Sequence, residues 1–281
     1  MAVLEVRGLT AGYGKVPVVN EVCFEAALSQ VVAIVGPNGA GKSTTLKATF
    51  GLVLRHGGEI LLDEQSIAAL PTHILAREGL SYVPQIDNVF PSMSVEENLQ
   101  LGSLMHKADF VERRDEVFEL FPDLGRARGR RAGQLSGGQR NMLGMARGLM
   151  SDPKAMLLDE PTAGLSPANV DVVWSQIRRI AELGTSVLVV EQNVARALQH
   201  ADRVYVLVGG RNYIDGSPAS LAEVDLGAVF LGATPSAGSR PETPTPTPTP
   251  TSTSTSTSTP TPMTRTATPT VTSTTKKPGE A

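Results

Sequence analysis

Short runs of apolar residues recur along the chain, separated by stretches in which apolar residues return every three or four positions. The runs are a few residues long and rich in β-branched side chains, which is typical of strands buried in a sheet. They lie at the N-terminus and at residues 31–35, 59–62, 155–158, 186–190 and 203–208. Because strand-like runs alternate with helical stretches, the pattern predicts an α/β fold.

The clearest helix signal follows Ser166. Ser166 has the character of a helix cap, Pro167 suits the first helical position, and Gly184 marks the end. The residues between them repeat at helical spacing, so one face of this helix should pack on the sheet. The apolar positions are Val170, Val173, Trp174, Ile177 and Ile180.

Between about Gln85 and Arg147 the strand-like runs disappear. Charged sequence with helical character takes over, most clearly at residues 95–104 and 110–120. This part of the chain is therefore expected to be helical.

Composition narrows the classes of protein. The chain has 281 residues, 41% of them hydrophobic, enough for one large core or two joined lobes. The apolar runs are far shorter than the roughly 20 residues that span a bilayer, and the first residues resemble a strand and not a signal peptide. Cys23 is the only cysteine, which excludes an internal disulfide and suits a reducing compartment. A net charge of −3 argues against a nucleic acid partner.

The last part of the chain changes character after about Ala233. Thr-Pro and Ser-Thr alternations fill residues 243–275, with almost nothing apolar to bury. We expect residues 233–281 to be a disordered tail with extended, polyproline-like stretches. Two readings stay open: a solvated tail without a role, or a regulatory tail that is phosphorylated.

A glycine-rich segment follows the apolar run at residues 31–35. It fits the pattern G-x-x-x-x-G-K-[ST] in full and comprises Gly36, Pro37, Asn38, Gly39, Ala40, Gly41, Lys42, Ser43 and Thr44. The glycines let backbone N–H groups curl around phosphate oxygens, and the helix that follows points its positive end at the same place. Lys42 would bind the β- and γ-phosphates, and the Ser43 hydroxyl would coordinate Mg²⁺.

A pair of acidic residues ends the apolar run at residues 155–158. A carboxylate at the carboxyl end of a parallel strand lies at the ligand crevice, where Asp159 can hold Mg²⁺ through its water shell. Glu160 can then orient and deprotonate the water that attacks the γ-phosphate. Alone, such a pair could equally cap the turn at Pro161.

A further motif between these two segments identifies a family. Leu135 begins the run Ser136, Gly137, Gly138, Gln139, which is similar to the signature of ATP-binding cassette (ABC) ATPases. The resemblance covers roughly residues 3–232 and implies a P-loop NTPase of ABC ATPase fold, with a RecA-like core, an antiparallel β subdomain and a helical subdomain at about 86–147. The matching positions imply that Gln85 is the glutamine that touches both Mg²⁺ and the transport partner, and that Tyr13 stacks on adenine.

The signature resembles a helix N-terminus built to bind an anion. Ser136 and the glycines present N–H groups and a hydroxyl at the start of a helix. The resemblance implies that the anion is the γ-phosphate of ATP held by a second ATPase. Each site would then need two chains.

Two positions depart from the commonest family pattern. Gln192 stands where the family has its switch histidine, and Ser166 stands where it commonly has aspartate. Glutamine can donate a hydrogen bond to the γ-phosphate but cannot relay a proton. Together with residues 90–98 and 191–193, these departures are similar to the second ATPase of branched-chain amino-acid importers, and related urea and short-chain amide importers share much of the pattern.

That branch implies a peripheral protein on the cytoplasmic face of the membrane. Its partners would be a sister ATPase, two membrane permease subunits and, indirectly, an extracytoplasmic binding protein. ATP and Mg²⁺ would be the cofactors. A homodimer and a weakly hydrolysing regulatory ABC protein stay open as alternatives. An ABC protein that acts on DNA or ribosomes is disfavoured, because the chain has neither a coiled-coil insertion nor a second cassette.

The segment after Gln85 is unusually apolar for a loop. Val89, Phe90 and Met93 would help form the groove that receives a cytoplasmic helix of the permease. The equal alternative is local packing within the helical lobe.

Deletion of the chain after Ala233 tests the two readings of the tail. If the tail is only solvated, the truncated protein should keep the ATPase and transport rates of the full chain, because the tail has nothing apolar to contribute to a core. Both rates are measured side by side. A changed rate would support a regulatory tail.

Overall fold

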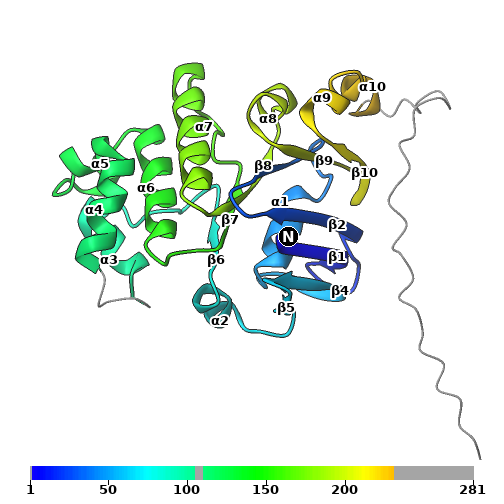
Figure 1. The fold of residues 1–281 in the computed structure, drawn as a ribbon, viewed down its shortest axis with the longest axis horizontal. Coiled ribbons are helices and arrows are strands. Elements are labelled where there is room, and N and C mark those ends of the chain that lie inside the picture. Colours follow the sequence, from blue (N-terminus) through cyan, green and yellow to red (C-terminus); the bar gives the residue numbers. More distant parts are fainter. Residues whose placement is uncertain (1, 105–109, 231–281) are drawn as a thin grey trace, which may run out of the picture. The chain divides into compact units, whose positions relative to one another are not determined.

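The computed structural model describes residues 2–104 and 110–230, all within one compact unit, Met1–Ser239. Within this unit Figure 1 shows two sheets, with the helices of the middle of the chain at one end. The strands are β1 (Ala2–Gly12), β2 (Val19–Ala27), β3 (Val31–Val35), β4 (Leu54–Leu62), β5 (Gln65–Ser66), β6 (Leu80–Val83), β7 (Ala155–Asp159), β8 (Ser186–Glu191), β9 (Arg203–Val208) and β10 (Arg211–Gly216). The helices are α1 (Lys42–Thr49), α2 (Thr72–Arg77), α3 (Val95–Gly102), α4 (Phe110–Leu120), α5 (Pro122–Arg126), the 3₁₀ helix η2 (Ala132–Gln134), α6 (Gly137–Leu149), α7 (Pro167–Glu182), α8 (Val194–His200), α9 (Pro218–Leu221) and α10 (Leu226–Phe230).

The larger sheet has the order β10-β9-β3-β8-β7-β6. Its strands β9, β3, β8, β7 and β6 are parallel, and β10 pairs antiparallel with β9 at one edge. Successive side chains of β3 alternate between two hydrophobic clusters: Val31 and Ala33 belong to one, Val32 and Ile34 to the other. The sheet is thus buried on both faces, which explains why its strands are continuous apolar runs.

Different elements cover the two faces. The smaller antiparallel sheet, of order β2-β1-β4-β5, shares one hydrophobic cluster with α1 and α2. Helices α3 to α10 supply residues to the other cluster, where α7 contributes Val173, Trp174, Ile177 and Ile180. The two faces of one sheet therefore anchor both the antiparallel sheet and the helices.

A side-chain amide joins the two sheets at their edges. Asn212 of β10 accepts a hydrogen bond from the Cys23 N–H of β2 at 2.8 Å and donates one to the Cys23 carbonyl at 2.9 Å. The Asn212 side chain thus bonds both backbone groups of Cys23, as a neighbouring strand would. Ion pairs on either side, Arg211 with Glu21 and Arg203 with Glu25, follow the same seam.

The α/β prediction is confirmed, and every strand-like run of the sequence lies in a strand. Strands β2, β5, β6 and β10 were not predicted, and β4 begins at Leu54, earlier than expected. Helix α7 begins at Pro167 after Ser166, as predicted, but the Ser166 side chain makes no capping hydrogen bond.

Between β6 and β7 the described residues form only helices and one isolated bridge, Ser94 with Arg131. The limits of a helical subdomain at about 86–147 stay a prediction. The expected tail, residues 233–281, lies outside the described residues.

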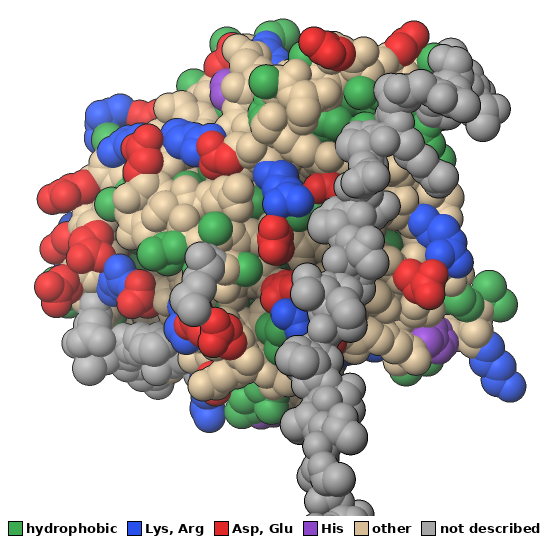
Figure 2. Space-filling view, turned by 45° about the vertical axis from the view of Figure 1, so that its right-hand side comes forward, with side chains coloured by type: hydrophobic (Ala, Val, Ile, Leu, Met, Phe, Trp, Pro, Cys, Tyr) green, Lys and Arg blue, Asp and Glu red, His purple; other side chains and the backbone are tan. Residues whose placement is uncertain are grey.

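The surface mixes charges of both signs. On the face in Figure 2 basic and acidic side chains interleave, with hydrophobic ones scattered between them. Among the described residues, no helix combines the length and the hydrophobicity needed to cross a bilayer.

Two adjacent valines of α7 allow a test of this packing. Val173 is fully buried whereas Val172 is 42% exposed. Val173→Ala should lower the free energy of unfolding by about 2 kcal/mol, because two buried methyl-sized groups are lost and a cavity is left. Val172→Ala, the matched control, should change it by less than about 0.5 kcal/mol. Urea unfolding followed by circular dichroism measures both, and equal losses would contradict this arrangement of α7.

Candidate functional site

The glycine-rich loop lies where β3 ends and α1 begins, at the carboxyl edge of the larger sheet. Gly36 is tightly enclosed, since a Cβ there would lie 2.2 Å from the carbonyl oxygen of Leu207. Gly41 has φ +92°, and a Cβ there would lie 2.5 Å from a methyl group of Val19. Both positions therefore require glycine, which leaves the loop as bare backbone around a small cavity.

Lys42 is the cation of this loop. Its side chain is 5% exposed, and its ammonium donates hydrogen bonds to the carbonyl oxygens of Gly36 (2.9 Å) and Pro37 (3.1 Å). Burial lowers the pKa of Lys42, while the carboxylates of Glu160, Asp159 and Glu191 oppose that shift. In this structure the lysine thus binds its own loop.

The remaining loop residues surround a cavity of about 190 Å³. Half-buried Ser43 and buried Thr44 line it together with Asn38, Gly39 and Gly41. Pro37 and Ala40 complete the loop, with the Ala40 N–H donating to the Pro37 carbonyl at 3.1 Å. The nine predicted residues are thus contiguous around one cavity or directly beside it.

Asp159 ends β7, two strands away from β3. One of its carboxylate oxygens accepts a hydrogen bond from the Tyr82 hydroxyl at 3.1 Å. Burial and the nearby Asp159 carboxylate raise the pKa of Tyr82, so the phenol stays a donor. The other oxygen, Oδ1, is buried and has no hydrogen-bond partner within the described residues. Such an orphaned oxygen is suited to a cation or a bound water.

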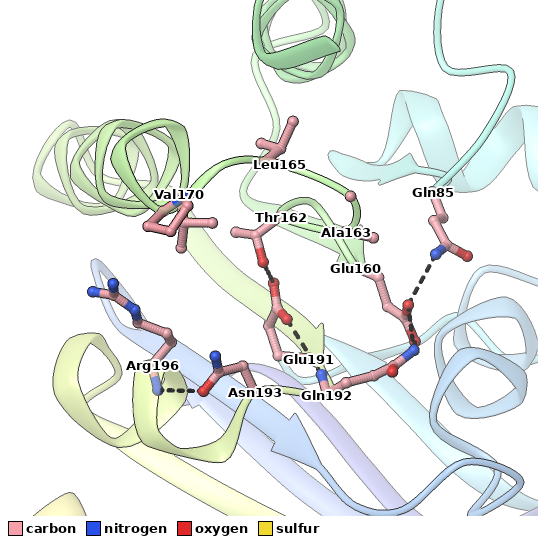
Figure 3. Close-up of a pocket in the computed structure, with 12 residues that line it drawn as sticks. Gln85, Glu160, Thr162, Ala163, Leu165, Val170, Glu191, Gln192, Asn193 and Arg196 are labelled. Carbon is pink, nitrogen blue, oxygen red and sulfur yellow. Dashed lines mark hydrogen bonds between the residues drawn. The ribbon is translucent and has the colours of Figure 1, made fainter.

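Glu160 follows directly and has backbone φ +47°, which is rare for a residue with a side chain. Its carboxylate accepts a hydrogen bond from the Gln85 amide at 2.9 Å. The Gln192 amide donates to both carboxylate oxygens, each at 2.8 Å. Figure 3 shows the two glutamines converging on Glu160 from different elements. The structure thus brings together the three residues expected to act in catalysis.

A second cavity, of about 400 Å³, opens beside Glu160. It is lined by the turn after β7 and the start of α8, and Glu160 lines both cavities. A carboxylate at such a junction can contact a phosphate chain on one side and water on the other.

The signature residues lie elsewhere. Ser136 caps α6 in a reciprocal arrangement: its hydroxyl oxygen accepts from the Gln139 N–H at 3.3 Å, and the Gln139 side chain accepts from the Ser136 N–H at 3.2 Å. Among the first N–H groups of α6, those of Gly137 and Gly138 have no partner within the described residues. None of the four lines either cavity, so this chain's own signature is separate from its own phosphate loop.

Tyr13 lies in the bend after β1 and is 67% exposed. It is not among the residues that line the phosphate-loop cavity. Its ring is therefore open for stacking but is not packed against the loop.

Three contact residues were not predicted. Tyr82 holds Asp159, and the Thr162 hydroxyl donates to the Glu191 carboxylate at 2.6 Å. Glu191 could have been noticed because it ends a fully apolar run, and a carboxylate there should lie at the same crevice as Asp159. Tyr82 and Thr162 gave no such signal.

Comparison with known proteins agrees with this geometry. The model of the family described as "ABC transporter" matches residues 19–163. The chain is 41% identical over 217 residues to the probable branched-chain amino acid transport ATP-binding protein LivF of Archaeoglobus fulgidus, covering 76% of this chain and 92% of the relative. It is 39% identical to the high-affinity branched-chain amino acid transport ATP-binding protein BraG of Pseudomonas aeruginosa, covering 74% and 90%. It is 33% identical to the lipopolysaccharide export system ATP-binding protein LptB of Escherichia coli K12, covering 83% and 98%.

The matched segment includes the glycine-rich loop, the signature and the Asp159-Glu160 pair. The predicted fold class is confirmed, and an ABC ATPase hydrolyses ATP to drive transport together with membrane permease components. With the family model covering half of the chain and relatives above 30% identity, this chain belongs to the ABC transporter family as an ATP-binding subunit.

Proposed function

We propose that this chain is the ATP-binding subunit of an importer of branched-chain amino acids, and that its own site hydrolyses ATP. The hydrolytic part rests on one observation: Glu160 lies between the two cavities with both carboxylate oxygens held by amides. The solute part rests on the relatives LivF and BraG, which are closer in identity than LptB. Export, as in the name of LptB, is the second candidate.

ATP would place its phosphates in the glycine-rich loop and its adenine against exposed Tyr13. Lys42 has to leave the carbonyl oxygens of Gly36 and Pro37 and turn to the β- and γ-phosphates. The exchange replaces two neutral acceptors by anionic ones, which makes stronger hydrogen bonds.

Three side chains in or beside the phosphate loop fit Mg²⁺, an ion that prefers oxygen ligands and keeps part of its water shell. The oxygen donors are the orphaned Oδ1 of Asp159, the Ser43 hydroxyl and the amide oxygen of Gln85, whose nitrogen is already bonded to Glu160. No group of three or more His, Cys, Asp or Glu suited to a metal occurs in the described ranges, so phosphate oxygens would complete the shell. When bound, the ion would neutralise charge on the β- and γ-phosphates.

Glu160 would act as the general base and orient the attacking water. The amide hydrogens of Gln85 and Gln192 hold its carboxylate in place, because each amide N–H donates to a carboxylate oxygen. To contact the γ-phosphate, Gln192 has to release at least one of its two bonds to Glu160. Unlike a histidine, it would do so without a change of charge.

The γ-phosphate would also need the signature of a second ATPase, since none of Ser136, Gly137, Gly138 and Gln139 lines this chain's own cavities. A hydroxyl is both donor and acceptor, and Ser136 uses only its acceptor side in the cap. Its hydrogen and the N–H groups of the two glycines would serve a phosphate in the partner's loop. We infer a heterodimer with a sister ATPase, with a homodimer as the alternative.

The docking surface for the permease would centre on Ile86 and Phe90, which are 73% and 47% exposed. Of the three residues expected there, Val89 and Met93 are half-buried and Phe90 is the exposed one. The guanidinium of Arg147 lies 5.2 Å from the Phe90 ring centre, and burial lowers the pKa of Arg147. An apolar ring beside a partly desolvated cation suits an amphipathic helix, and this would hold the chain at the cytoplasmic face of the membrane.

Replacement of Glu160 tests the hydrolytic proposal. Glu160→Gln keeps the size of the side chain but removes its basicity, so ATP turnover of the reconstituted complex should fall by at least about 100-fold, with ATP still bound. Phosphate release and binding of a labelled nucleotide measure the two properties. Glu182→Gln, at an exposed position of α7, is the matched control and should behave as wild type. Unchanged turnover in Glu160→Gln would mean that this chain's own site is not the catalytic one.

Replacement of Phe90 tests the docking surface. Phe90→Asp introduces a charge into an apolar contact and supplies Arg147 with a carboxylate, so uptake of labelled leucine by the complex should drop by about tenfold or more. Nucleotide binding should stay within about twofold, because the two cavities do not include Phe90.

Val111→Asp is the control for Phe90→Asp, since Val111 is 59% exposed on α4. It should leave uptake unchanged. Loss of ATP binding in the purified Phe90→Asp subunit would instead favour local packing within the helical lobe.

A further inference from the structure

A second contact joins the same two loops that carry Glu160 and Gln192. Thr162 lies two residues after Glu160, and Glu191 lies directly before Gln192. The Thr162 hydroxyl donates to Glu191 Oε1 at 2.6 Å, and the Gln192 N–H donates to Glu191 Oε2 at 3.2 Å. Figure 3 shows this contact beside the bonds between Gln192 and Glu160.

Both partners are buried. Glu191 is 3% exposed and Thr162 is 8% exposed. Burial raises the pKa of the Glu191 carboxyl, and hydrogen bonds from Thr162 and from the Gln192 N–H oppose that shift. No ion pair of Glu191 occurs in the described part of the chain. A buried carboxyl that forms no ion pair is costly even with the Lys42 ammonium nearby, so a purely structural site would be filled more cheaply by an apolar residue.

The position of the Glu191 carboxyl suits it to fix two loops relative to each other. Both bonds from Gln192 to Glu160 start from one amide nitrogen and would let one loop pivot about that point, whereas a second contact elsewhere fixes their relative orientation. The turn that carries Glu160 is also under strain, with φ +47°, and is closed by the Ala163 N–H donating to the Glu160 carbonyl at 3.1 Å. Such a conformation persists only where its surroundings hold it.

We propose that Glu191 and Thr162 are positioning residues for ATP hydrolysis, and that their hydrogen bond locks the loop of Glu160 to the loop of Gln192. Neither residue lines the phosphate-loop cavity, so the pair would act through Glu160 and Gln192. This proposal rests on the proposed role of Glu160 as general base. It deepens that role, because the hydrogen bond between Thr162 and Glu191 explains what orients the Glu160 carboxylate.

The first test removes the hydroxyl and keeps the shape. In the full chain, assembled in its complex, Thr162→Val should lower kcat about tenfold while KM for ATP stays within about twofold, because a small misplacement of a catalytic group slows chemistry more than binding. Thr162→Ser keeps the hydroxyl and should restore kcat to within about twofold of wild type. If Thr162→Val does not fold, Thr162→Ala, which only deletes atoms, takes its place.

Thr185 provides a matched control. It is 7% exposed, its hydroxyl donates to the Pro153 carbonyl at 3.2 Å, and it lies before β8, at the end opposite to Glu191. Thr185→Val also loses a buried hydroxyl bond and should keep the wild-type kcat even if the melting temperature falls. Equal losses of kcat in Thr162→Val and Thr185→Val would reduce the effect to general destabilisation and overturn the proposal, as would a wild-type kcat in Thr162→Val.

A double variant tests whether the two residues act as a pair. Glu191→Leu should lower kcat to a similar extent, and Thr162→Val combined with Glu191→Leu should be no slower than the slower single variant. If the loss of kcat in the double variant equals the product of the two single losses, the two residues act separately. That result would contradict the proposal that they act as a pair. Glu160→Gln, run alongside, separates the two hypotheses. If it is inactive while Thr162→Val is normal, only the pair fails; if Glu160→Gln turns over normally, both fail.

Discussion

The six-stranded sheet is buried on both faces, and this constraint decides where polar chemistry can occur in the molecule. Side chains along β3, β7 and β8 alternate between two apolar clusters, which leaves no face open to water. Along these three strands polar side chains stand only at the strand ends. Since the three strands are parallel neighbours, their ends meet at one edge and bring Gly36, Asp159 and Glu191 together.

The same edge concentrates negative charge. Three carboxylates, Asp159, Glu160 and Glu191, act on the single ammonium of Lys42, and each occupies a different environment. Asp159 pairs with a phenol and keeps a free oxygen, Glu160 is bound by amides, and Glu191 by a hydroxyl and an N–H. We infer that these environments separate three roles for one type of side chain: metal binding, proton transfer and positioning.

Much of this could be predicted from sequence, because the decisive signals are local. The loop from Gly36 to Thr44 and the Asp159-Glu160 pair each follow a recognisable apolar strand, so position along the chain gives position in the sheet. Strands β2 and β10 gave weaker signals: β2 mixes Asn20, Glu21 and Glu25 among its apolar residues, and β10 pairs only at an edge. The contact of Thr162 with Glu191 spans 29 positions and depends on β7 pairing with β8, which no local pattern states. Val89 is half-buried against the core, so whether it lines a groove for the permease stays a prediction.

The self-capped start of α6 has an electrical consequence. The oxygen of Ser136 and that of the Gln139 side chain both face inward, onto N–H groups of their own turn. What the helix end presents is therefore mainly the N–H groups of Gly137 and Gly138, backed by the positive pole of the helix dipole. This polarity favours an anion there over a metal ion or an ammonium group. If this surface meets the nucleotide site of a second subunit, as proposed, it would select by sign of charge before any shape is compared, and an empty site would give it nothing to bind.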